Sequence, residues 1–330
     1  MAARSVLVVG GTGFLGQRIA ETLRDAGCQV TLLTRGQRPT ADFELVAVDR
    51  HDADGLRAAL GRRSFDVVVD NIAFTGEEVE RLLEALRGRI GHYIQTSSAA
   101  VYADRYTRRP LRETDADLTA RLPADGPNPF HPRLGHAYGN GKREAEQALL
   151  QAGVDWTALR PPIILASDDR TRRVWWFVQR LLDGQPVLIP DWGPGRVFQV
   201  AWTHDVARAV ACAAGNPAAF GHAYNVAQAE IYTAESWIEA CAAVLNVRPR
   251  YAHVAEDCPP GYRLPVAGRP FGHILLDCGA IRAELGFEPS PESVWLAETI
   301  GGCAARPPRE PSAGYESRAE EVRLARTAAR

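Results

Sequence analysis

Residues 6–16, which read VLVVGGTGFLG, decide the fold of this chain. The four apolar residues at the start of this stretch are typical of a strand that is buried on both faces. Glycines follow at positions 10, 13 and 16, and a helix-like run begins directly after them at residue 17. A strand, a glycine-rich turn and a helix in this order predict a site for the pyrophosphate of a dinucleotide.

Each glycine of the turn has its own physical role. Gly10 allows the tight turn, Gly13 has no side chain to hold the phosphates away, and Gly16 lets the helix pack close to the strand. The N-terminus of the helix then faces the anion. The spacing is G-x-x-G-x-x-G, which many different chemistries use. The expected cofactor contacts in this turn are Gly10, Thr12, Gly13, Phe14, Leu15 and Gly16.

Composition and charge narrow the class of protein. The chain has 330 residues, of which 46% are hydrophobic and 24% charged, as in an ordinary soluble globular protein. The net charge of -2 gives no indication of a nucleic-acid partner. No apolar run approaches the roughly 20 residues of a membrane helix, and the first strand leaves no room for a signal peptide. The six scattered cysteines indicate reduced thiols and a cytoplasmic location. No cluster of His, Cys, Asp or Glu has the spacing of metal ligands, so no metal site is expected.

Strands and helices alternate along the first half of the chain. After the first strand, strand-like runs lie at residues 30–33, 45–48, 65–70, 92–96 and 156–160. This alternation predicts an α/β fold with a doubly wound parallel sheet of the Rossmann type, whose ligands lie at the carboxyl ends of the strands. Three residues that directly follow the fourth strand are therefore expected at the cofactor, namely Asn71, Ile72 and Ala73.

The end of the second strand indicates which dinucleotide is bound. NAD sites usually carry an acidic residue there, which bonds the ribose hydroxyls. This chain has Thr34 at that position, and Arg35 follows it. A carboxylate would repel a 2′-phosphate, whereas a guanidinium can pair with it through two hydrogen bonds. The sequence therefore favours NADP, and the alternative is a solvated loop arginine beside a NAD site.

The chemistry is expected from Ser98, Tyr138 and Lys142. Tyr138 and Lys142 are four residues apart in a helix-like run, so both side chains emerge on one face. A free tyrosine has a pKa of about 10, and an ammonium group one turn away lowers that pKa by stabilising the phenolate. Ser98, at the end of the fifth strand, can hold a substrate oxygen beside the phenol. The three would move a proton at a carbinol or carbonyl while a hydride moves to or from a nicotinamide.

These motifs in combination resemble an extended short-chain dehydrogenase/reductase of the NAD-dependent epimerase/dehydratase family, from about residue 5 to about residue 300. The matching stretches are GGTGFLG at 10–16, SSAAVY at 97–102, Y-x-x-x-K at 138–142, LRPP at 159–162, THDVA at 203–207, YNV at 224–226 and LGFEP at 285–289. In two stretches, GKREAE at 141–146 and VFQV at 197–200, the chain also resembles the chloroplast stem-loop RNA-binding branch of this superfamily.

The resemblance implies a domain organisation and further contacts. It implies a dinucleotide-binding Rossmann domain at 1–160, to which 200–228 returns, and a smaller C-terminal α/β substrate-binding part at 161–199 and 229–303. It places Asp49 near the adenine, Pro161 and Ile163 near the nicotinamide, and Lys142 at the nicotinamide ribose. It also implies a homodimer through the helices at 77–87 and 135–150. The polar, proline-led segment 304–330 is expected to be a surface tail.

Some residues depart from the family pattern or allow two interpretations. The stretch after the fourth strand reads Asp70-Asn71-Ile72-Ala73-Phe74, where the family has small residues, and two glycines at 139 and 141 weaken the expected catalytic helix. Three arginines, Arg172, Arg173 and Arg180, either bind a substrate phosphate or form a solvated helix face. Because the aromatic run 175–177 is helical, at least one ring is expected in the core and one in a cleft or at a partner.

Three functions are compatible with these residues. The first is an NADP-dependent oxidoreductase, a carbonyl reductase or alcohol dehydrogenase, with a small-molecule substrate. The second is an epimerase or dehydratase that acts on a nucleotide-linked sugar and retains its NAD(P). The third is a non-catalytic binding protein on the same fold. Arg35 favours the reductase, the overall resemblance favours the epimerase, and the intact Ser98, Tyr138 and Lys142 disfavour the third.

Overall fold

The computed structural model describes residues 4–38, 40–105, 108–126, 135–190, 196–254, 258–259, 262, 264–265 and 275–328. The chain forms two compact units, which are described separately. Unit 1 comprises Met1–Pro162, Thr203–Ala227 and Leu276–Glu288, and unit 2 comprises Ile163–Trp202, Gln228–Leu275 and Pro289–Arg330. No helix of the described residues is long and apolar enough to cross a membrane.

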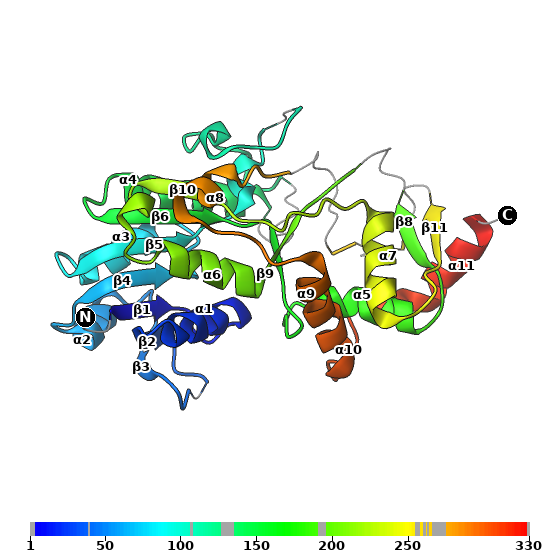
Figure 1. The fold of residues 1–330 in the computed structure, drawn as a ribbon, viewed down its shortest axis with the longest axis horizontal. Helices are drawn as coiled ribbons and strands as arrows, with labels where there is room; N and C mark the ends of the chain where they lie inside the picture. Colours follow the sequence, from blue (N-terminus) through cyan, green and yellow to red (C-terminus); the bar gives the residue numbers. More distant parts are fainter. Residues whose placement is uncertain are drawn as a thin grey trace. The chain divides into compact units, whose positions relative to one another are not determined.

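Unit 1 is a doubly wound Rossmann-type unit around a seven-stranded, fully parallel sheet in the order β10-β6-β5-β4-β1-β2-β3. Helices α1 and α6 pack together on one face of this sheet, and α2, α3 and α4 cover the other (Figure 1). The strands are β1 (Ser5–Val9), β2 (Gln29–Thr34), β3 (Glu44–Ala47), β4 (Phe65–Asp70), β5 (Ile90–Thr96), β6 (Asp155–Arg160) and β10 (His222–Asn225). The helices are α1 (Phe14–Asp25), α2 (Ala53–Leu60), α3 (Gly76–Ala85), α4 (His136–Leu150), α6 (Thr203–Ala213) and α8 (Gly279–Leu285).

The strand order reverses between β1 and β4, and this reversal positions the site. From β1 the chain continues outward through β2 to β3, whereas from β4 it continues in the other direction through β5. Loops that leave the carboxyl ends of β1 and β4 therefore diverge, and in open α/β sheets a ligand crevice forms at such a point. The central residues Val6–Val9 are fully buried, which explains why this strand reads as an uninterrupted apolar run.

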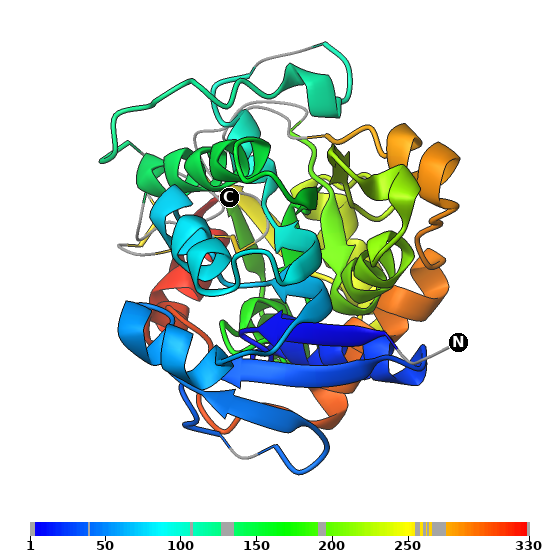
Figure 2. The same ribbon diagram turned by 90° about the vertical axis from the view of Figure 1, so that its left-hand side faces the viewer.

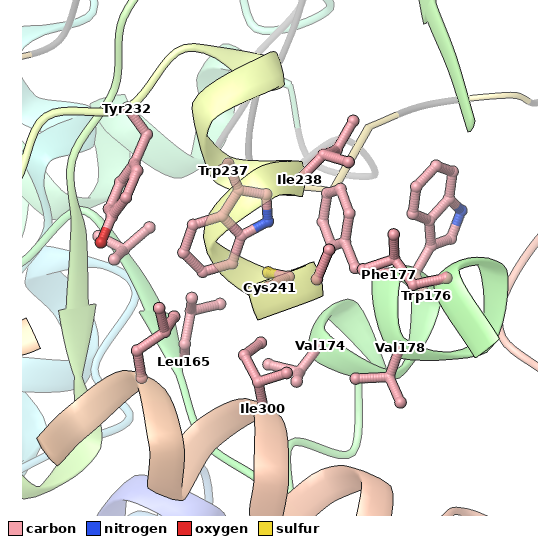
Figure 3. Packing of buried hydrophobic residues seen from close by; sticks show 14 of the residues in the cluster. Leu165, Val174, Trp176, Phe177, Val178, Tyr232, Trp237, Ile238, Cys241 and Ile300 are labelled. Carbon is pink, nitrogen blue, oxygen red and sulfur yellow. The ribbon is translucent and has the colours of Figure 1, made fainter. Parts of the chain in front are cut away.

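Unit 2 is built around an aromatic core (Figure 3). The indoles of Trp237 and Trp295 are stacked with ring centroids 6.2 Å apart, and Phe177 and Tyr232 each meet Trp237 edge-on. The elements are the parallel pairs β7 (Ile163–Leu165) with β9 (Val200–Trp202) and β8 (Val187–Pro190) with β11 (Tyr251–Val254), then α5 (Arg173–Leu182), α7 (Ala234–Leu245), α9 (Glu292–Leu296), a π-helical turn η4 (Ala297–Gly301), α10 (Gly302–Ala305) and α11 (Arg318–Ala328).

The aromatic run of α5 divides between core and periphery. Trp176 and Phe177 are buried in the core of unit 2, whereas Trp175 is only partly buried. The prediction that one of these rings lies in the core is therefore confirmed.

The prediction of a surface tail after Ala304 is wrong for the described residues. Helix α11 packs against β8 and β11, as Figure 1 shows at the red end of the chain. Its Glu321 is 0% exposed and accepts hydrogen bonds from Arg180 at 3.0 and 2.7 Å and from Arg318 at 2.8 Å. The polar composition that suggested a tail is explained by ion pairs inside unit 2, so Arg180 is neither a free phosphate ligand nor part of a solvated face.

A second difference concerns residues 276–288. The sequence placed them in the smaller part, but the structure places them in unit 1. The amide of Asp277 donates to the carbonyl of Leu111 at 2.9 Å, and the side-chain amide of Asn225 donates to the carbonyl of Asp277 at 3.1 Å. These contacts attach the segment to Leu111 and to β10, and no sequence motif indicates them.

We expect Glu321→Ala to lower the free energy of unfolding by about 3–5 kcal/mol, because it leaves two guanidinium groups buried around a missing carboxylate. Urea denaturation followed by tryptophan fluorescence measures the change. The matched control is Glu320→Ala, one residue earlier, whose ion pair with Arg323 lies at the surface. The control should unfold like the unmodified chain, and equal stability of both variants would contradict the buried arrangement.

Candidate active site

The glycine turn after β1 forms a close-packed cradle. Gly10 has a φ of +83°, and a Cβ atom there would lie 2.4 Å from the side chain of Ile72. A Cβ atom on Gly16 would lie 2.2 Å from the carbonyl oxygen of Gly10, so only glycine lets α1 approach the turn this closely. A Cβ on Gly13 would meet nothing nearer than 3.8 Å, which leaves space above the turn. Helix α1 begins at Phe14, three residues earlier than expected, with Gly13 as its N-cap.

Two polar groups without partners lie at the carboxyl ends of neighbouring strands, as the glycine turn does after β1. The side-chain oxygen of Asn71, after β4, and the hydroxyl of Thr96, at the end of β5, are buried and make no hydrogen bond in the described part of the chain. Buried polar atoms of this kind are rare unless a ligand or water completes them. Three features fit the dinucleotide predicted from the sequence. The glycines of the turn have no side chains that would occupy the space of a ligand, the N-terminus of α1 has no side-chain cap, and the polar groups of Asn71 and Thr96 lack partners in the described part of the chain.

The loop after β2 carries Thr34 and Arg35, which the sequence predicts near the ribose of the cofactor. The hydroxyl of Thr34 accepts a hydrogen bond from the amide of Gly36 at 3.1 Å, which shapes the turn. Arg35 is exposed and forms no ion pair with any described residue. Arg38 donates to the carbonyl of Thr12 at 3.0 Å and thereby ties this loop to the glycine turn. Arg38 is not among the residues predicted from the sequence, although its place in the same short loop as Arg35 is an available signal.

Several predicted contacts have other local roles in the structure. The carboxylate of Asp49 is exposed and accepts the amide of His51 at 2.9 Å. The carbonyl of Pro161 accepts the amide of Ala99 at 2.9 Å, which anchors the segment after β5. Ile163 begins β7 and belongs to unit 2, so it is not part of the site that unit 1 forms by itself.

Tyr138 and Lys142 lie together on α4. The ammonium nitrogen of Lys142 is 5.7 Å from the centre of the Tyr138 ring and 5.2 Å from the centre of the Phe74 ring. Lys142 is 3% exposed and donates to the carbonyls of Ala73 at 2.7 Å and Thr96 at 2.8 Å, which fix it between the ends of β4 and β5. Burial lowers the pKa of Lys142 to about 8. The phenol therefore stands beside a rigidly held ammonium group, as the Y-x-x-x-K spacing predicts.

Ser98 is buried directly after β5. Its hydroxyl oxygen accepts the amide of Ala100 at 3.1 Å and so caps the short 3-10 helix η1 (Ala99–Tyr102). The neighbouring Ser97 donates its hydroxyl to Glu146 on α4. Ser98 thus retains its own hydrogen for donation, and its contact with a substrate oxygen stays a prediction.

The unusual sequence after β4 is explained by a buried ion pair. Asp70 accepts both Nη groups of Arg50 at 2.8 Å and the hydroxyl of Tyr93 at 2.6 Å. It also accepts the amides of Ile72 and Ala73, which sets the course of the loop. Burial acts to raise the pKa of Asp70, but the pair with Arg50 holds it below its ordinary value. Arg50 and Tyr93 are not predicted from the sequence as partners of Asp70.

A close backbone contact explains why α4 has a glycine at position 141. A Cβ atom at this position would lie 2.2 Å from the carbonyl oxygen of Phe74. Across the same contact, a Cβ on Gly76 would lie 3.0 Å from the carbonyl oxygen of Glu144. Figure 2 shows α3 and α4 side by side, consistent with their packing. The glycine costs helix propensity, but it brings the loop after β4 against the helix that carries Tyr138 and Lys142.

A second buried network joins α4 to the sheet. Arg160, at the end of β6, donates to both carboxylate oxygens of Glu146 at 3.0 and 2.6 Å. It also donates to the hydroxyl of Tyr102 at 2.8 Å, which in turn donates to the side chain of Asn225 at 2.8 Å. The LRPP, SSAAVY and YNV stretches therefore share a structural role, because each supplies one member of this network.

The chain is similar to known proteins in sequence and in fold. The model of the NAD dependent epimerase/dehydratase family matches residues 6–227. The chloroplast stem-loop binding protein of 41 kDa b of Arabidopsis thaliana is 32% identical over 255 residues, 72% of this chain and 62% of that protein. This chain therefore spans about three fifths of the length of that relative.

Two further similarities extend over nearly the whole chain. The (4-alkanoyl-5-oxo-2,5-dihydrofuran-3-yl)methyl phosphate reductase of Streptomyces griseus is 27% identical over 319 residues, 94% of this chain and 97% of that protein. The UDP-glucose 4-epimerase of Thermus thermophilus in complex with NAD has a TM-score of 0.67 at 20% identity, covering 92% of this chain and 100% of that one. The second similarity shows the fold alone.

We expect Gly141→Ala to destabilise the protein by about 1–3 kcal/mol, because the new methyl group would overlap the carbonyl of Phe74. This loss outweighs the roughly 1 kcal/mol that alanine gains over glycine in a helix. Thermal unfolding followed by circular dichroism measures the balance. The control is Gly301→Ala in the turn η4, where the nearest atom to an added Cβ is a methyl of Val244 at 3.7 Å. If both variants were equally stable, the close approach would be refuted.

Proposed function

The chain belongs to the NAD dependent epimerase/dehydratase family, and on this premise we propose that it is an NADP-dependent oxidoreductase that interconverts a carbonyl and an alcohol. The observation that carries the proposal is the Tyr138–Lys142 pair, which α4 holds against the ends of β4 and β5. Tyr138 is the general acid and base, Lys142 supports it electrostatically, and Ser98 holds the substrate oxygen.

The described residues of unit 1 are suited to hold the cofactor. The glycine turn and the N-terminus of α1 would bind its pyrophosphate, and Asn71, Ile72 and Ala73 would line its ribose end. When bound, the dinucleotide supplies or accepts the hydride. Lys142 uses two of its three N–H donors on the carbonyls of Ala73 and Thr96, and the third remains for a ribose hydroxyl.

Proton transfer depends on the environment of Tyr138. In the reductive direction the phenol donates its proton to the substrate oxygen, and the adjacent ammonium of Lys142 stabilises the phenolate that is left. Because the pKa of Lys142 is lowered to about 8, this ammonium is largely charged at neutral pH and loses its charge as the pH rises through 8. The electrostatic support of Tyr138 is therefore strongest on the acidic side of that value.

The preference for NADP is supported by the arginines after β2. Arg35 is exposed without an ion-pair partner in the described part of the chain, so a 2′-phosphate would not have to displace a carboxylate. No acidic residue occupies the position of Thr34, where one would favour NAD. Bound NAD in a structural relative keeps NAD as the alternative cofactor.

The second candidate reaction is epimerisation or dehydration of a nucleotide-linked sugar with retained NAD(P). It is favoured by the family and by the solved epimerase of similar fold. The reductase is favoured by Arg35 and by the similarity to a phosphate-ester reductase along almost the whole chain. Similarity to a stem-loop binding protein suggests a non-catalytic binding function as well. Such a function does not explain the arrangement of Tyr138 and Lys142.

We expect Arg35→Asp to shift the cofactor preference from NADP towards NAD by about 10- to 100-fold, because it replaces a charge-assisted hydrogen-bonding pair by charge repulsion. Calorimetric titration with both dinucleotides measures the ratio of the two dissociation constants. Arg62→Asp, at another exposed arginine of unit 1, is the control and should leave the ratio unchanged. If the Arg35→Asp variant had the same ratio of dissociation constants as the unmodified protein, the preference for NADP would be contradicted.

We expect Tyr138→Phe to lower turnover by about 10²- to 10⁴-fold while dinucleotide affinity changes little, because only the proton-transfer group is removed. Stopped-flow absorbance with a panel of ketones and nucleotide sugars measures turnover, and calorimetry measures cofactor binding. Tyr251→Phe, at a tyrosine in unit 2, is the control. Full activity of the Tyr138→Phe variant would exclude the mechanism, and absence of any dinucleotide binding would exclude both enzymatic functions.

A further inference from the structure

Unit 2 contains a hollow of about 400 Å³ that the proposed reaction does not use. One wall is the segment that follows β7 together with the first turn of α5, and the other is the segment from Cys303 to Glu310. All of the lining residues belong to unit 2, so the hollow is defined without reference to the site on unit 1. Four arginines and three carboxylates line it.

The charges in this hollow do not cancel. Asp169 is buried and already engaged by Thr171 at 2.8 Å and by Arg173 at 3.4 Å. Glu310 is paired with Arg172 at 2.8 Å. Asp168, the third carboxylate, is exposed and forms no ion pair with any described residue.

On the opposite wall, Arg306 and Arg309 form no ion pair with any residue of the described ranges. Burial raises the pKa of the Cys303 thiol to about 11, so this group adds no negative charge. The hollow therefore has guanidinium groups in excess of its carboxylates, and these favour an anion with several oxygens.

One residue that lines the hollow carries an unsatisfied donor. The indole N–H of Trp175 is buried and has no hydrogen-bond acceptor in the described part of the chain, although Trp175 lines the hollow. Leaving such a donor unpaired is unfavourable in general, and a ligand oxygen would remove that cost. Val174, Pro308 and the ring of Trp175 form apolar surface beside it.

We propose that this hollow binds the phosphate group of an organic phosphate. Arg306 and Arg309 pair with the phosphate oxygens, Trp175 donates its indole N–H to one of them, and the apolar wall contacts the organic part. Inorganic phosphate shares the anion chemistry but lacks the apolar contact, so it binds more weakly. This site is independent of the dinucleotide site and of the reaction proposed above.

The test uses the full chain labelled with ¹⁵N at its seven tryptophans, whose indole N–H signals are resolved by NMR. Trp175→Phe identifies the signal of Trp175 and removes the donor while keeping an aromatic ring. Phenyl phosphate and inorganic phosphate are then titrated separately. We expect a saturable shift of the Trp175 signal, with phenyl phosphate binding about five- to tenfold more tightly than inorganic phosphate because it also buries its ring.

Two double variants decide the assignment. Arg306→Gln with Arg309→Gln should weaken phenyl phosphate binding at least tenfold, since both guanidinium contacts are lost. Arg248→Gln with Arg250→Gln, at exposed arginines elsewhere in unit 2, should leave it unchanged. A Trp175 signal that does not shift with about 20 mM of either probe, the upper end of millimolar affinity, would overturn the proposal. So would equal weakening in both double variants, or equal affinity for the two probes.

Discussion

The ion pair between Glu146 and Arg160 is the interaction on which the arrangement of unit 1 depends. It is removed from water on all sides, and both carboxylate oxygens are occupied by the guanidinium group. Such a pair adds little to stability by itself, because desolvation offsets attraction, but it permits only one relative position of its two elements. Glu146 is one turn beyond Lys142 on α4, so the pair fixes the helix that carries the proposed chemistry to the end of β6.

Much of unit 1 could be predicted from the sequence because its signals are local. The geometry of two of these motifs is set within a few residues of sequence. They are the glycine turn between a buried strand and a helix, and the tyrosine four residues before a lysine. The partners of Asp70 could not be predicted in this way, since Arg50 and Tyr93 lie 20 and 23 positions away along the chain. The same holds for Gly141, whose need for a bare Cα comes from the carbonyl of Phe74 on another element.

The segment after Ala304 shows why composition alone does not predict whether a polar segment is buried. Charged residues are usually at the surface, and a proline-led polar stretch usually lacks a core. In unit 2 the charges of Arg180, Arg318, Asp183 and Glu321 satisfy one another, and the guanidinium carbon of Arg180 lies 3.9 Å from the ring centre of Trp176. Burial is possible here because every charge has a partner, and that pairing is a property of the tertiary structure that no window of the sequence contains.

The interleaving of the two units along the chain has a consequence for how the protein can be made. Unit 1 receives β10 only after the first segment of unit 2 has been synthesised, and it receives the segment 276–288 after the second; unit 2 receives Glu321 later still. Neither unit can therefore complete its fold as a nascent N-terminal piece during translation. Until residue 225 emerges, β6 is an unpaired sheet edge and the polar cluster at its end lacks Asn225.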